Sequence, residues 1–514
     1  MSTGKRIGII LVLLFVFSIL FVLSCTLVMF LAPGTEIFGV RYVSAFVGNY
    51  EKDVSIESFS GDVYIETQNV PITIEFVDYY ATNLSFHQNF TGFTQTKINQ
   101  AGVDYYVENG DLKIKTTEFI KFIYANEDYD NFHFVLRLPA YAFNASQRSI
   151  NITAGQSPVK FVGSPKLKNL NISTSGVISV DGNVSVYNDF ILKIGKSTEI
   201  GDSFNLTNLD VTTRGDAYVN ITKAISGDLK VNTRGGDVMF ISCNNLYAET
   251  VSGSIRGTGT NGAVVDYNVN IKTRSGSVEL AEANKMYQAR VCKSTIETKS
   301  GKVNITNAYD IDVVSDSGNV FIGNANNVNI TNRIGLVEVK ESNGNLYINN
   351  ANGASVAGEN GALKNVKIES NSGVIKVYNT KGTVDLKSNY NSVTFKNQTS
   401  SRIYLYAGKK LVAENLFGEV TAYATENVSM KFSQITANIS VEVGNKAKVV
   451  DIDATCSKIG TVSYVLRSTK GERAKLYAGD DLIADNSTIS NVQSGQYLIN
   501  VKTVYARTSL YFSA

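Results

Sequence analysis

The sequence predicts an all-β protein, in which an N-terminal transmembrane helix carries a β-solenoid ectodomain of the right-handed β-helix type. Three observations predict it: a repeated strand–glycine–strand motif, five prolines that all fall at or before Pro165, and an uncharged apolar run near the N-terminus. Hydrophobic residues make up 43% of the 514 residues and charged residues 18%, so the chain can bury a large core. The net charge of +2 argues against nucleic acid as a partner.

The apolar run covers residues 7–32 and contains no charged side chain. A spanning helix needs about 20 apolar residues, so the run is long enough to cross a bilayer. Lys5 and Arg6 precede it, and the next cation is Arg41. The positive-inside rule therefore predicts a cytoplasmic tail at 1–6, a single-pass helix in the cell membrane at 7–32, and an extracellular ectodomain. The lipid bilayer is then the first expected partner.

A lipoprotein signal is the main alternative for this run. Val22-Leu23-Ser24-Cys25 is similar to a lipobox, which would place cleavage before Cys25. The residues after Cys25 stay apolar, whereas a mature lipoprotein begins with a polar tether. A cleaved signal peptide also has a shorter apolar core, of about 7–15 residues. An uncleaved anchor is the favoured interpretation.

A repeated motif occupies much of the remaining chain, as in VNIKTRSGSVEL (269–280), STIETKSGKVNI (294–305) and VKIESNSGVIKV (366–377). Apolar residues stand seven and five positions before a glycine and two and four positions after it. This alternation on both sides of a turn indicates two strands, each with one buried face. The glycines that mark these turns are Gly61, Gly236, Gly253, Gly276, Gly301, Gly318, Gly344 and Gly373.

The spacing of these glycines favours a solenoid. Successive intervals between Gly236 and Gly373 vary from 17 to 29 residues. A solenoid tolerates such variation because extra residues can leave each coil as a loop. One coil per interval would give on the order of 16–25 coils. The alternative is an array of hairpins, in which the two strands of each copy pair with each other.

The regularity of the motif divides the ectodomain into three parts. Residues 37–150 are expected to form an N-terminal β cap and the first coils, and residues 151–400 the solenoid repeats. Residues 401–514 lose the Ser-Gly turn but keep the alternation, so they are expected to form degenerate coils or a C-terminal β cap. The segment 279–290 has helical composition and is expected to form a short helical turn.

The motif resembles the adhesin-like β-strand-repeat family of bacterial surface proteins. The resemblance covers roughly 50–400 and includes Leu138-Pro139, which matches a hydrophobic-Pro pair at the end of a strand that precedes the repeats in that family. It implies a right-handed β-solenoid-like fold and an adhesin role. It implies no catalytic residue, so none is carried over.

Two sets of polar residues recur at fixed places in the motif. Asparagines six residues after the glycine could stack into a hydrogen-bonded ladder with a structural role, namely Asn307, Asn324, Asn350 and Asn379. Cations just before the turn could line one edge of a solenoid and bind an anionic polymer, namely Arg214, Arg234, Arg274 and Lys299. A solvated turn position is the plainer interpretation of these cations.

Cysteine and histidine give weaker signals. Cys243 and Cys292 could form a disulfide in an oxidising compartment, although an odd number of extracellular cysteines leaves one thiol over. His87 and His133 have no neighbouring Cys or His at the spacing of metal ligands. We therefore expect no metal, no cofactor and no catalytic residue.

A signalling or assembly role, in which the short cytoplasmic tail reports on the envelope, is one possible function, but a six-residue tail has little capacity for it. Two other functions are compatible with these features. The first is a membrane-anchored, extracytoplasmic adhesin-like or structural surface protein without catalytic activity, whose partners would be glycan, an anionic envelope polymer or surface proteins. The second is a carbohydrate-active enzyme of the polysaccharide lyase or hydrolase type on a β-helix. A groove with three or more carboxylates beside an Arg or Lys would favour the enzyme.

Overall fold

The computed structural model describes most of residues 37–514 and part of the N-terminal apolar run. The described residues are 11–24, 36–37, 40–41, 49–56, 58–67, 70–79, 82–89, 103–116, 132–143, 147–258, 262–283, 293–350, 353–357, 365–378, 380, 382–396, 401–459, 461–470, 472–492 and 496–513. They divide into two compact units, Met1–Ala217 and Tyr218–Ala514, which are described separately.

The predicted membrane segment is covered only in part. Residues 11–24 form a helix, and the rest of the span predicted at 7–32 lies outside the described residues, as do the tail 1–6 and Cys25. Among the described residues, none of the helices has both the length and the apolar character that a membrane crossing requires.

The first unit is built almost wholly from strands. Its elements are β1 (Glu36–Ile37), β2 (Val40–Arg41), β3 (Asn49–Ile56), β4 (Val63–Glu66), β5 (Ile72–Val77), β6 (Thr82–Asn89), β7 (Val103–Glu108), β8 (Asp111–Thr116), β9 (Phe132–Pro139), the 3₁₀ turn η1 (Ala140–Ala142), β10 (Ile150–Gly155), β11 (Val159–Gly163), β12 (Lys166–Leu167), β13 (Leu170–Thr174), β14 (Ile178–Gly182), β15 (Val184–Ile194), β16 (Thr198–Ile200) and β17 (Phe204–Thr213).

Two mixed sheets organise these strands. In one, β4, β8, β10, β13, β15 and β17 run parallel, and β7 closes the edge antiparallel to β8. In the other, β14, β11, β5 and β9 run parallel, and β6 and β3 continue antiparallel. The antiparallel strands give this part of the chain a pairing pattern different from that of a coil.

The turn at Gly61 differs from the sequence prediction. The motif places Val63 after the corner of a coil, but β4 pairs with β10, which precedes a corner. The N–H of Gly61 donates instead to the carbonyl oxygen of Gly110 at 2.7 Å. The segment 54–65 therefore has the local pattern of a repeat without its place in the stack.

The second unit contains the strands β18 to β49. They are β18 (Val219–Ile221), β19 (Ile225–Thr233), β20 (Val238–Phe240), β21 (Ser242–Thr250), β22 (Ile255–Gly257), β23 (Val264–Val265), β24 (Val269–Thr273), β25 (Val278–Ala283), β26 (Ser294–Thr298), β27 (Val303–Ala308), β28 (Asp310–Ser315), β29 (Val320–Ala325), β30 (Asn327–Asn332), β31 (Val337–Ser342), β32 (Asn345–Asn350), β33 (Gly353–Ala357), β34 (Asn365–Ser370), β35 (Val374–Tyr378), β36 (Thr383–Ser388), β37 (Val393–Lys396), β38 (Arg402–Ala407), β39 (Leu411–Leu416), β40 (Glu419–Ala424), β41 (Val428–Phe432), β42 (Ile439–Val443), β43 (Val449–Lys458), β44 (Ser463–Ser468), β45 (Ala474–Ala478), β46 (Asp481–Asn486), β47 (Thr488–Asn491), β48 (Leu498–Thr503) and β49 (Arg507–Ser513).

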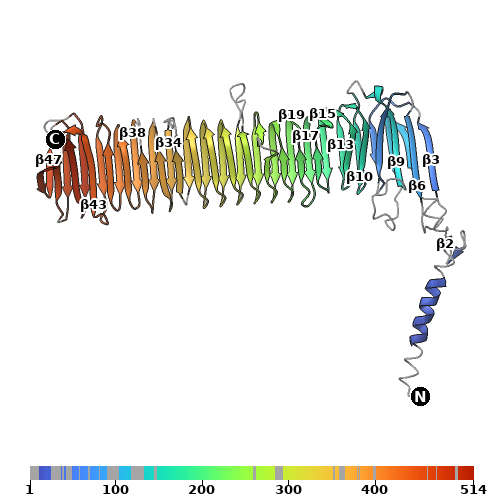
Figure 1. Ribbon diagram of the computed structural model, residues 1–514, viewed down its shortest axis with the longest axis horizontal. Helices are drawn as coiled ribbons and strands as arrows, with labels where there is room; N and C mark the ends of the chain where they lie inside the picture. Colours follow the sequence, from blue (N-terminus) through green and yellow to red (C-terminus); the bar gives the residue numbers. More distant parts are fainter. Residues whose placement is uncertain are drawn as a thin grey trace, which may run out of the picture. The chain divides into compact units, whose positions relative to one another are not determined.

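These strands form two parallel ladders. The leading ladder contains the strand before each corner, as in β24–β26–β28–β30, and the trailing ladder contains the strand after it, as in β25–β27–β29–β31. The strands of these ladders before β44 thus pair with the turns on either side of them and not with their neighbours along the chain (Figure 1). The solenoid is confirmed, with about 14 turns, and the hairpin array is wrong. Its right-handedness stays a prediction.

The number of turns is smaller than one coil per interval would give. The mixed sheets of the first unit take strands that the motif spacing assigns to coils, and four strands near the C-terminus pair antiparallel. The expected helical turn is also wrong for its first residues, because Val278–Ala283 is strand β25. Residues 284–290 lie outside the described part.

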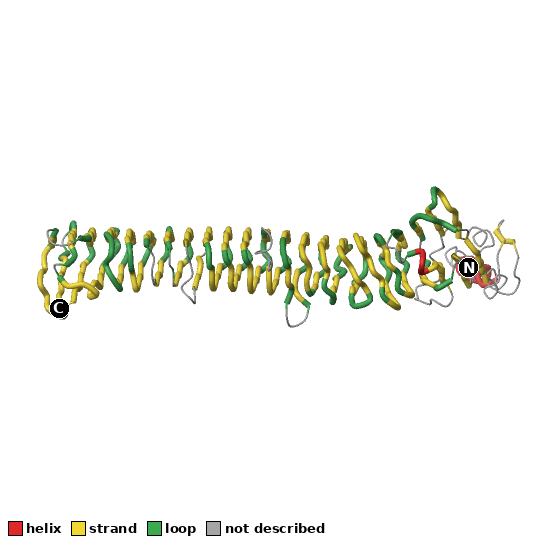
Figure 2. The backbone as a smooth tube through the Cα atoms, turned by 90° about the horizontal axis from the view of Figure 1, so that it is seen from above, coloured by secondary structure: helices red, strands yellow, loops and turns green. Residues whose placement is uncertain are grey.

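The core lies between the two ladders. Alternate side chains of each strand are buried, as with Val269 and Ile271 in β24 and Val303 and Ile305 in β27, all at most 1% exposed. Figure 2 shows the same two-strand outline repeated from turn to turn. Full burial of one such side chain contributes about 1.5–3 kcal/mol, so the period-two pattern fixes the register of each strand.

The corner glycines stack directly on one another. A Cβ added at Gly253, Gly276, Gly301 or Gly318 would overlap the carbonyl oxygen of the glycine one turn earlier, so glycine is required by the close backbone approach. Gly335 continues this stack on Gly318, whereas Gly344 does not. The sequence prediction for 337–348 is therefore half a turn out of phase. Its first strand, β31, belongs to the trailing ladder, and β32 belongs to the leading ladder.

The C-terminal end departs from sequence order. β48 lies between β42 and β44, and β49 lies between β43 and β45, so the last turn along the chain is inserted next to the end of the stack. β47 and β46 then pair antiparallel with β44 and β45. These antiparallel strands cover the edges that the last parallel turn would otherwise present.

Candidate functional site

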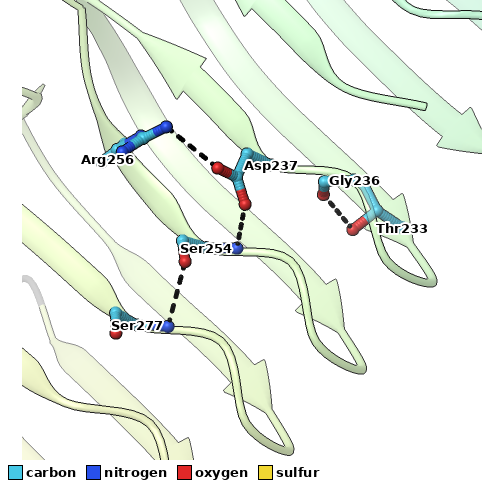
Figure 3. Close-up of polar contacts among 6 residues, drawn as sticks. All are labelled: Thr233, Gly236, Asp237, Ser254, Arg256 and Ser277. Carbon is cyan, nitrogen blue, oxygen red and sulfur yellow. Dashed lines mark hydrogen bonds and ion pairs between the residues drawn. The ribbon is translucent and has the colours of Figure 1, made fainter. Parts of the chain in front are cut away.

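The corners of the solenoid are held by buried hydroxyl groups. Thr233, three residues before Gly236, is 2% exposed and donates its hydroxyl to the Gly236 carbonyl oxygen at 3.0 Å (Figure 3). The hydroxyl of Thr298 accepts the N–H of Gly301 at 2.9 Å. The threonine of the motif thus satisfies backbone groups of the turn that would otherwise be buried without a partner.

Polar side chains just after the corner link successive turns. One carboxylate oxygen of Asp237 accepts the N–H of Ser254 at 2.8 Å, and the other accepts from Arg256 at 3.0 Å (Figure 3). The hydroxyl of Ser254 then accepts the N–H of Ser277 at 3.3 Å. These contacts have a structural explanation, because they join neighbouring turns.

The predicted cations are only partly brought together. Arg274 and Lys299 lie in adjacent turns, and both side chains are exposed. Val251 separates Arg274 from Arg234, and Asp316 follows Lys299 in the same column. Asp316 in turn contacts Arg333 at 3.6 Å. The fourth cation, Arg214, belongs to the other unit.

The predicted asparagines occupy two different places. The amide of Asn324 donates to Asn307 Oδ1 at 3.1 Å on the exposed surface. Asn350 is fully buried in the leading ladder, beside Asn332, and donates to the Gly335 carbonyl oxygen at 2.9 Å. This separation follows from the phase shift at Gly344. Asn379 lies outside the described residues.

Another ladder of amides and carboxylates was not predicted. It occupies the residue that opens each leading strand. Asn327 donates to Asp310 Oδ1 at 2.7 Å, the N–H of Asn345 donates to Asn327 Oδ1 at 2.8 Å, and Asn365 donates to Asn345 Oδ1 at 2.8 Å. The sequence contains this pattern as a polar residue eight positions before each corner glycine. The pattern can be recognised only if the corner glycines are assigned correctly, and Gly335 was not.

An open groove lies beside this ladder, on the outer face of the leading strands. Its volume is ≈ 370 Å³. We call it the amide groove, and its lining side chains come from two columns of successive turns. The first column contains Lys293, Asp310, Asn327 and Asn345. The second contains Asp312, Asn329 and Tyr347. Ile311 and Val328 lie beneath them.

The charges of the amide groove are mostly paired. Lys293 contacts Asp312 at 2.8 Å, and this hydrogen bond raises the pKa of the Lys293 amine. Asp310 accepts from Asn327, as described above. Lys367 lies over the ring of Tyr347, 5.7 Å from its centroid, and contacts Glu369 at 3.2 Å. The groove therefore presents amides, an aromatic ring and two partnered carboxylates.

The cysteines and histidines do not add a site. Cys243 is a buried free thiol whose pKa is raised by burial, Cys456 is an exposed free thiol, and Cys292 lies outside the described residues. The register of β6 and β9 sets His87 opposite His133, an adjacency that the sequence spacing hides. Within the described part of the chain, no group of three His, Cys, Asp or Glu could hold a metal ion.

Comparisons with known proteins give little further detail. No protein-family model matches the chain, and no curated protein matches it. A solved structure of a candidate cell adhesion protein from Clostridium sporogenes is similar at 6% identity and a TM-score of 0.14, over 90% of this chain and 100% of that chain. A candidate adhesin from Parabacteroides merdae is similar at 12% identity and a TM-score of 0.19, over 64% of this chain and 95% of that chain. Similarity at these scores gives no information about the site.

Proposed function

We propose that the protein is a membrane-anchored, extracytoplasmic surface protein that acts by binding, as an adhesin-like or structural element, without catalytic activity. The observation that carries this proposal is the amide groove on the outer face of the solenoid. Its polar groups are arranged to hold a ligand against a rigid sheet. Sites on regular strands keep their geometry well, which suits recognition of a repetitive surface.

The anchor is part of the proposal. The uncharged run 7–32 is long enough for a spanning helix, and Lys5 and Arg6 favour a cytoplasmic N-terminus. Large apolar side chains of helix 11–24, such as Phe17, are exposed. Contact of such apolar side chains with water is unfavourable, and a lipid environment would cover them.

The charge pattern of the groove favours binding over the enzyme alternative. A polysaccharide hydrolase needs a pair of carboxyl groups that are free to transfer protons or to attack the sugar, and a lyase needs a group that is free to accept a proton. The groove has two carboxylates, below the three that we set as the criterion. Asp312 is paired with Lys293, and Asp310 accepts from an amide. These contacts hold both carboxylates in fixed hydrogen bonds.

The test uses the full chain purified in detergent micelles. The protein is incubated with cell envelopes and with isolated envelope polysaccharides, and binding is measured together with the release of new reducing or unsaturated ends. We expect saturable binding and no release. In parallel, protease treatment of intact cells that express the full chain should remove the ectodomain and leave a membrane-embedded fragment.

Two results would overturn the proposal. Release of new chain ends that grows with time would show a polysaccharide-degrading enzyme. An ectodomain that is protected from protease on intact cells, but digested after the cells are broken, would place it on the cytoplasmic side.

A further inference from the structure

We propose that the amide groove binds an uncharged glycan, a chain of hexopyranose units that lies across the leading strands β28, β30 and β32 along the direction of stacking. This inference rests on the proposed binding function and names its ligand class. It concerns only the second unit of the chain.

The groove is hollow because of side-chain size. Asn329 stands between Asp312 and Tyr347 at the same register position of three successive strands. Asn329 is exposed and short, whereas the Lys293–Asp312 pair and the Tyr347 ring stand on either side of it. The resulting volume of ≈ 370 Å³ lies at the small end of the range of ligand sites, about 300–1,000 Å³. It suits a short stretch of a glycan.

The lining groups match the chemistry of sugar hydroxyls. A hydroxyl both donates and accepts, and an asparagine side chain offers an acceptor and two donors. Asn327 and Asn345 are oriented by the ladder, because their Oδ1 atoms accept from the next turn. Orientation before binding lowers the entropy lost when the ligand is held.

Tyr347 supplies the apolar part of such a site. The C–H faces of a hexopyranose pack against aromatic rings, and a tyrosine presents an apolar face with a polar end. The Nζ atom of Lys367 lies over this ring, 5.7 Å from its centroid. The ring therefore stands at one end of the groove, where it can contact the end of the ligand.

The charges argue for an uncharged ligand. The groove contains two carboxylates and one ammonium group, and the ammonium is already engaged by Asp312. An anionic polymer would meet Asp310 and Asp312, and like charges at close range disfavour binding. The exposed cations Arg274 and Lys299 lie at the corners, outside the groove lining.

The spacing of the turns supports an extended ligand. Adjacent strands in a sheet lie about 4.8 Å apart, which is comparable to the length of one hexopyranose unit. Successive turns can thus meet successive sugar units with similar groups.

The experiment uses groove variants of the full chain in detergent, each with a control from the same column. Tyr347→Ala removes the ring, and Asn329→Trp fills the hollow. Tyr404→Ala and Asn270→Trp change exposed residues of the same column outside the groove lining. Cellohexaose, maltohexaose and chitohexaose serve as uncharged probes and a polygalacturonate hexamer as the anionic probe, with binding measured by calorimetry at low and high salt.

We expect at least one uncharged hexasaccharide to bind, with a Kd that changes little with salt. Tyr347→Ala should raise that Kd about tenfold. Asn329→Trp should abolish binding, and both control variants should bind as the wild type does. Circular dichroism of each variant checks that the strands are intact.

Three outcomes would overturn the inference. They are failure of all three uncharged probes to bind, tighter binding of the polygalacturonate hexamer with strong salt dependence, and equal effects of groove and control variants. In each case, envelope binding that persists in the groove variants would leave the proposed function standing. If the wild type does not bind cell envelopes, both the proposed function and this inference are wrong.

Discussion

The middle and the later turns of the second unit build the same corner in different ways. In the middle turns, Thr298 and Ser315 are buried three residues before the corner glycine and hydrogen-bond to it. In the later turns, Ala407, Ala424 and Val443 occupy the same register position, and each is at most 1% exposed. The parallel ladders continue through both regions.

The difference shows what the corner requires. A buried hydroxyl must be paired, and the turn backbone pairs it, so threonine is tolerated together with a closely stacked glycine. A small apolar side chain needs no partner, and the later turns vary in their glycines: a Cβ at Gly408 would overlap the carbonyl oxygen of Asn389, whereas Gly444 has more room. The strand register is common to both regions, and the Ser-Gly signature belongs to only one of them.

Replacement of a corner glycine should separate the two regions most clearly. In Gly301→Ala, the new Cβ would overlap the carbonyl oxygen of Gly276, which is backbone and cannot move without shifting the ladder. We expect a loss of about 3 kcal/mol of local stability. In Gly444→Ala, the nearest atom is Thr425 Cα at 3.2 Å, and the loss should be about 1 kcal/mol or less.

Hydrogen exchange of the amides in the affected turns measures these losses in the full chain, because solenoid turns can open locally. Equal protection of the two variants would show that close glycine stacking does not distinguish the regions.

Removal of the buried hydroxyl should have a smaller effect. Thr298→Val keeps the shape of the side chain but takes away the acceptor of the Gly301 N–H. We expect a loss of about 1–3 kcal/mol, seen as faster exchange at that turn. Thr295→Val is the control, because Thr295 is half-buried on the same strand. A neutral Thr298→Val would mean that the middle turns do not depend on the polar corner.

The sequence predicted the strand alternation well and the phase of the turns less well. The corner glycines from Gly236 to Gly318 could be identified because each stands two residues before a buried valine or isoleucine, and three of them, Gly276, Gly301 and Gly318, also follow a polar pair. Gly335 has no such pair before it. Asn343-Gly344 resembles the turn of the motif, but it lies at the start of the leading strand β32 and not after its end. Alternation is the same on both strands of a turn, so the pattern could not reveal the half-turn shift.

The amide groove could not be predicted for the same physical reason. Its two columns combine side chains from four successive turns, such as Lys293, Asp312 and Tyr347, whose neighbourhood exists only once the register is fixed. The sequence showed many asparagines but assigned the ladder to the wrong column at Asn350. The loss of Ser-Gly after residue 401 likewise hid turns that need no polar corner.

Ring stacking on the outer face should add a modest amount of stability to the later turns. Tyr406 and Tyr423 lie in adjacent turns with their ring centroids 4.8 Å apart and 13° between the planes. Tyr406→Leu should cost about 0.5–1.5 kcal/mol, and a double-mutant cycle with Tyr423→Leu should assign it to the pair. Tyr404→Leu, on the same strand, is the control. Additive single effects in the cycle would contradict a specific contribution from stacking.

The ionisation of Tyr423 should report the same stack with the smallest effect. Burial raises the pKa of Tyr423 above its usual value, and the neighbouring Tyr406 and Glu442 raise it further. A raised pKa in the folded state means that this tyrosine contributes stability that is present below its unfolded pKa, about 10, and is lost as the pH rises through the folded pKa.

Ultraviolet absorbance of the phenolate, compared between wild type and Tyr423→Phe, follows this group. Glu442→Gln should lower the pKa of Tyr423, because it removes a nearby negative charge that disfavours the phenolate. Tyr406→Leu should also lower the pKa of Tyr423, because it removes the negative charge that the Tyr406 phenolate carries at alkaline pH. If neither variant moves the titration, burial alone sets the pKa of Tyr423. The later turns would then be joined on this face by packing without measurable electrostatic coupling.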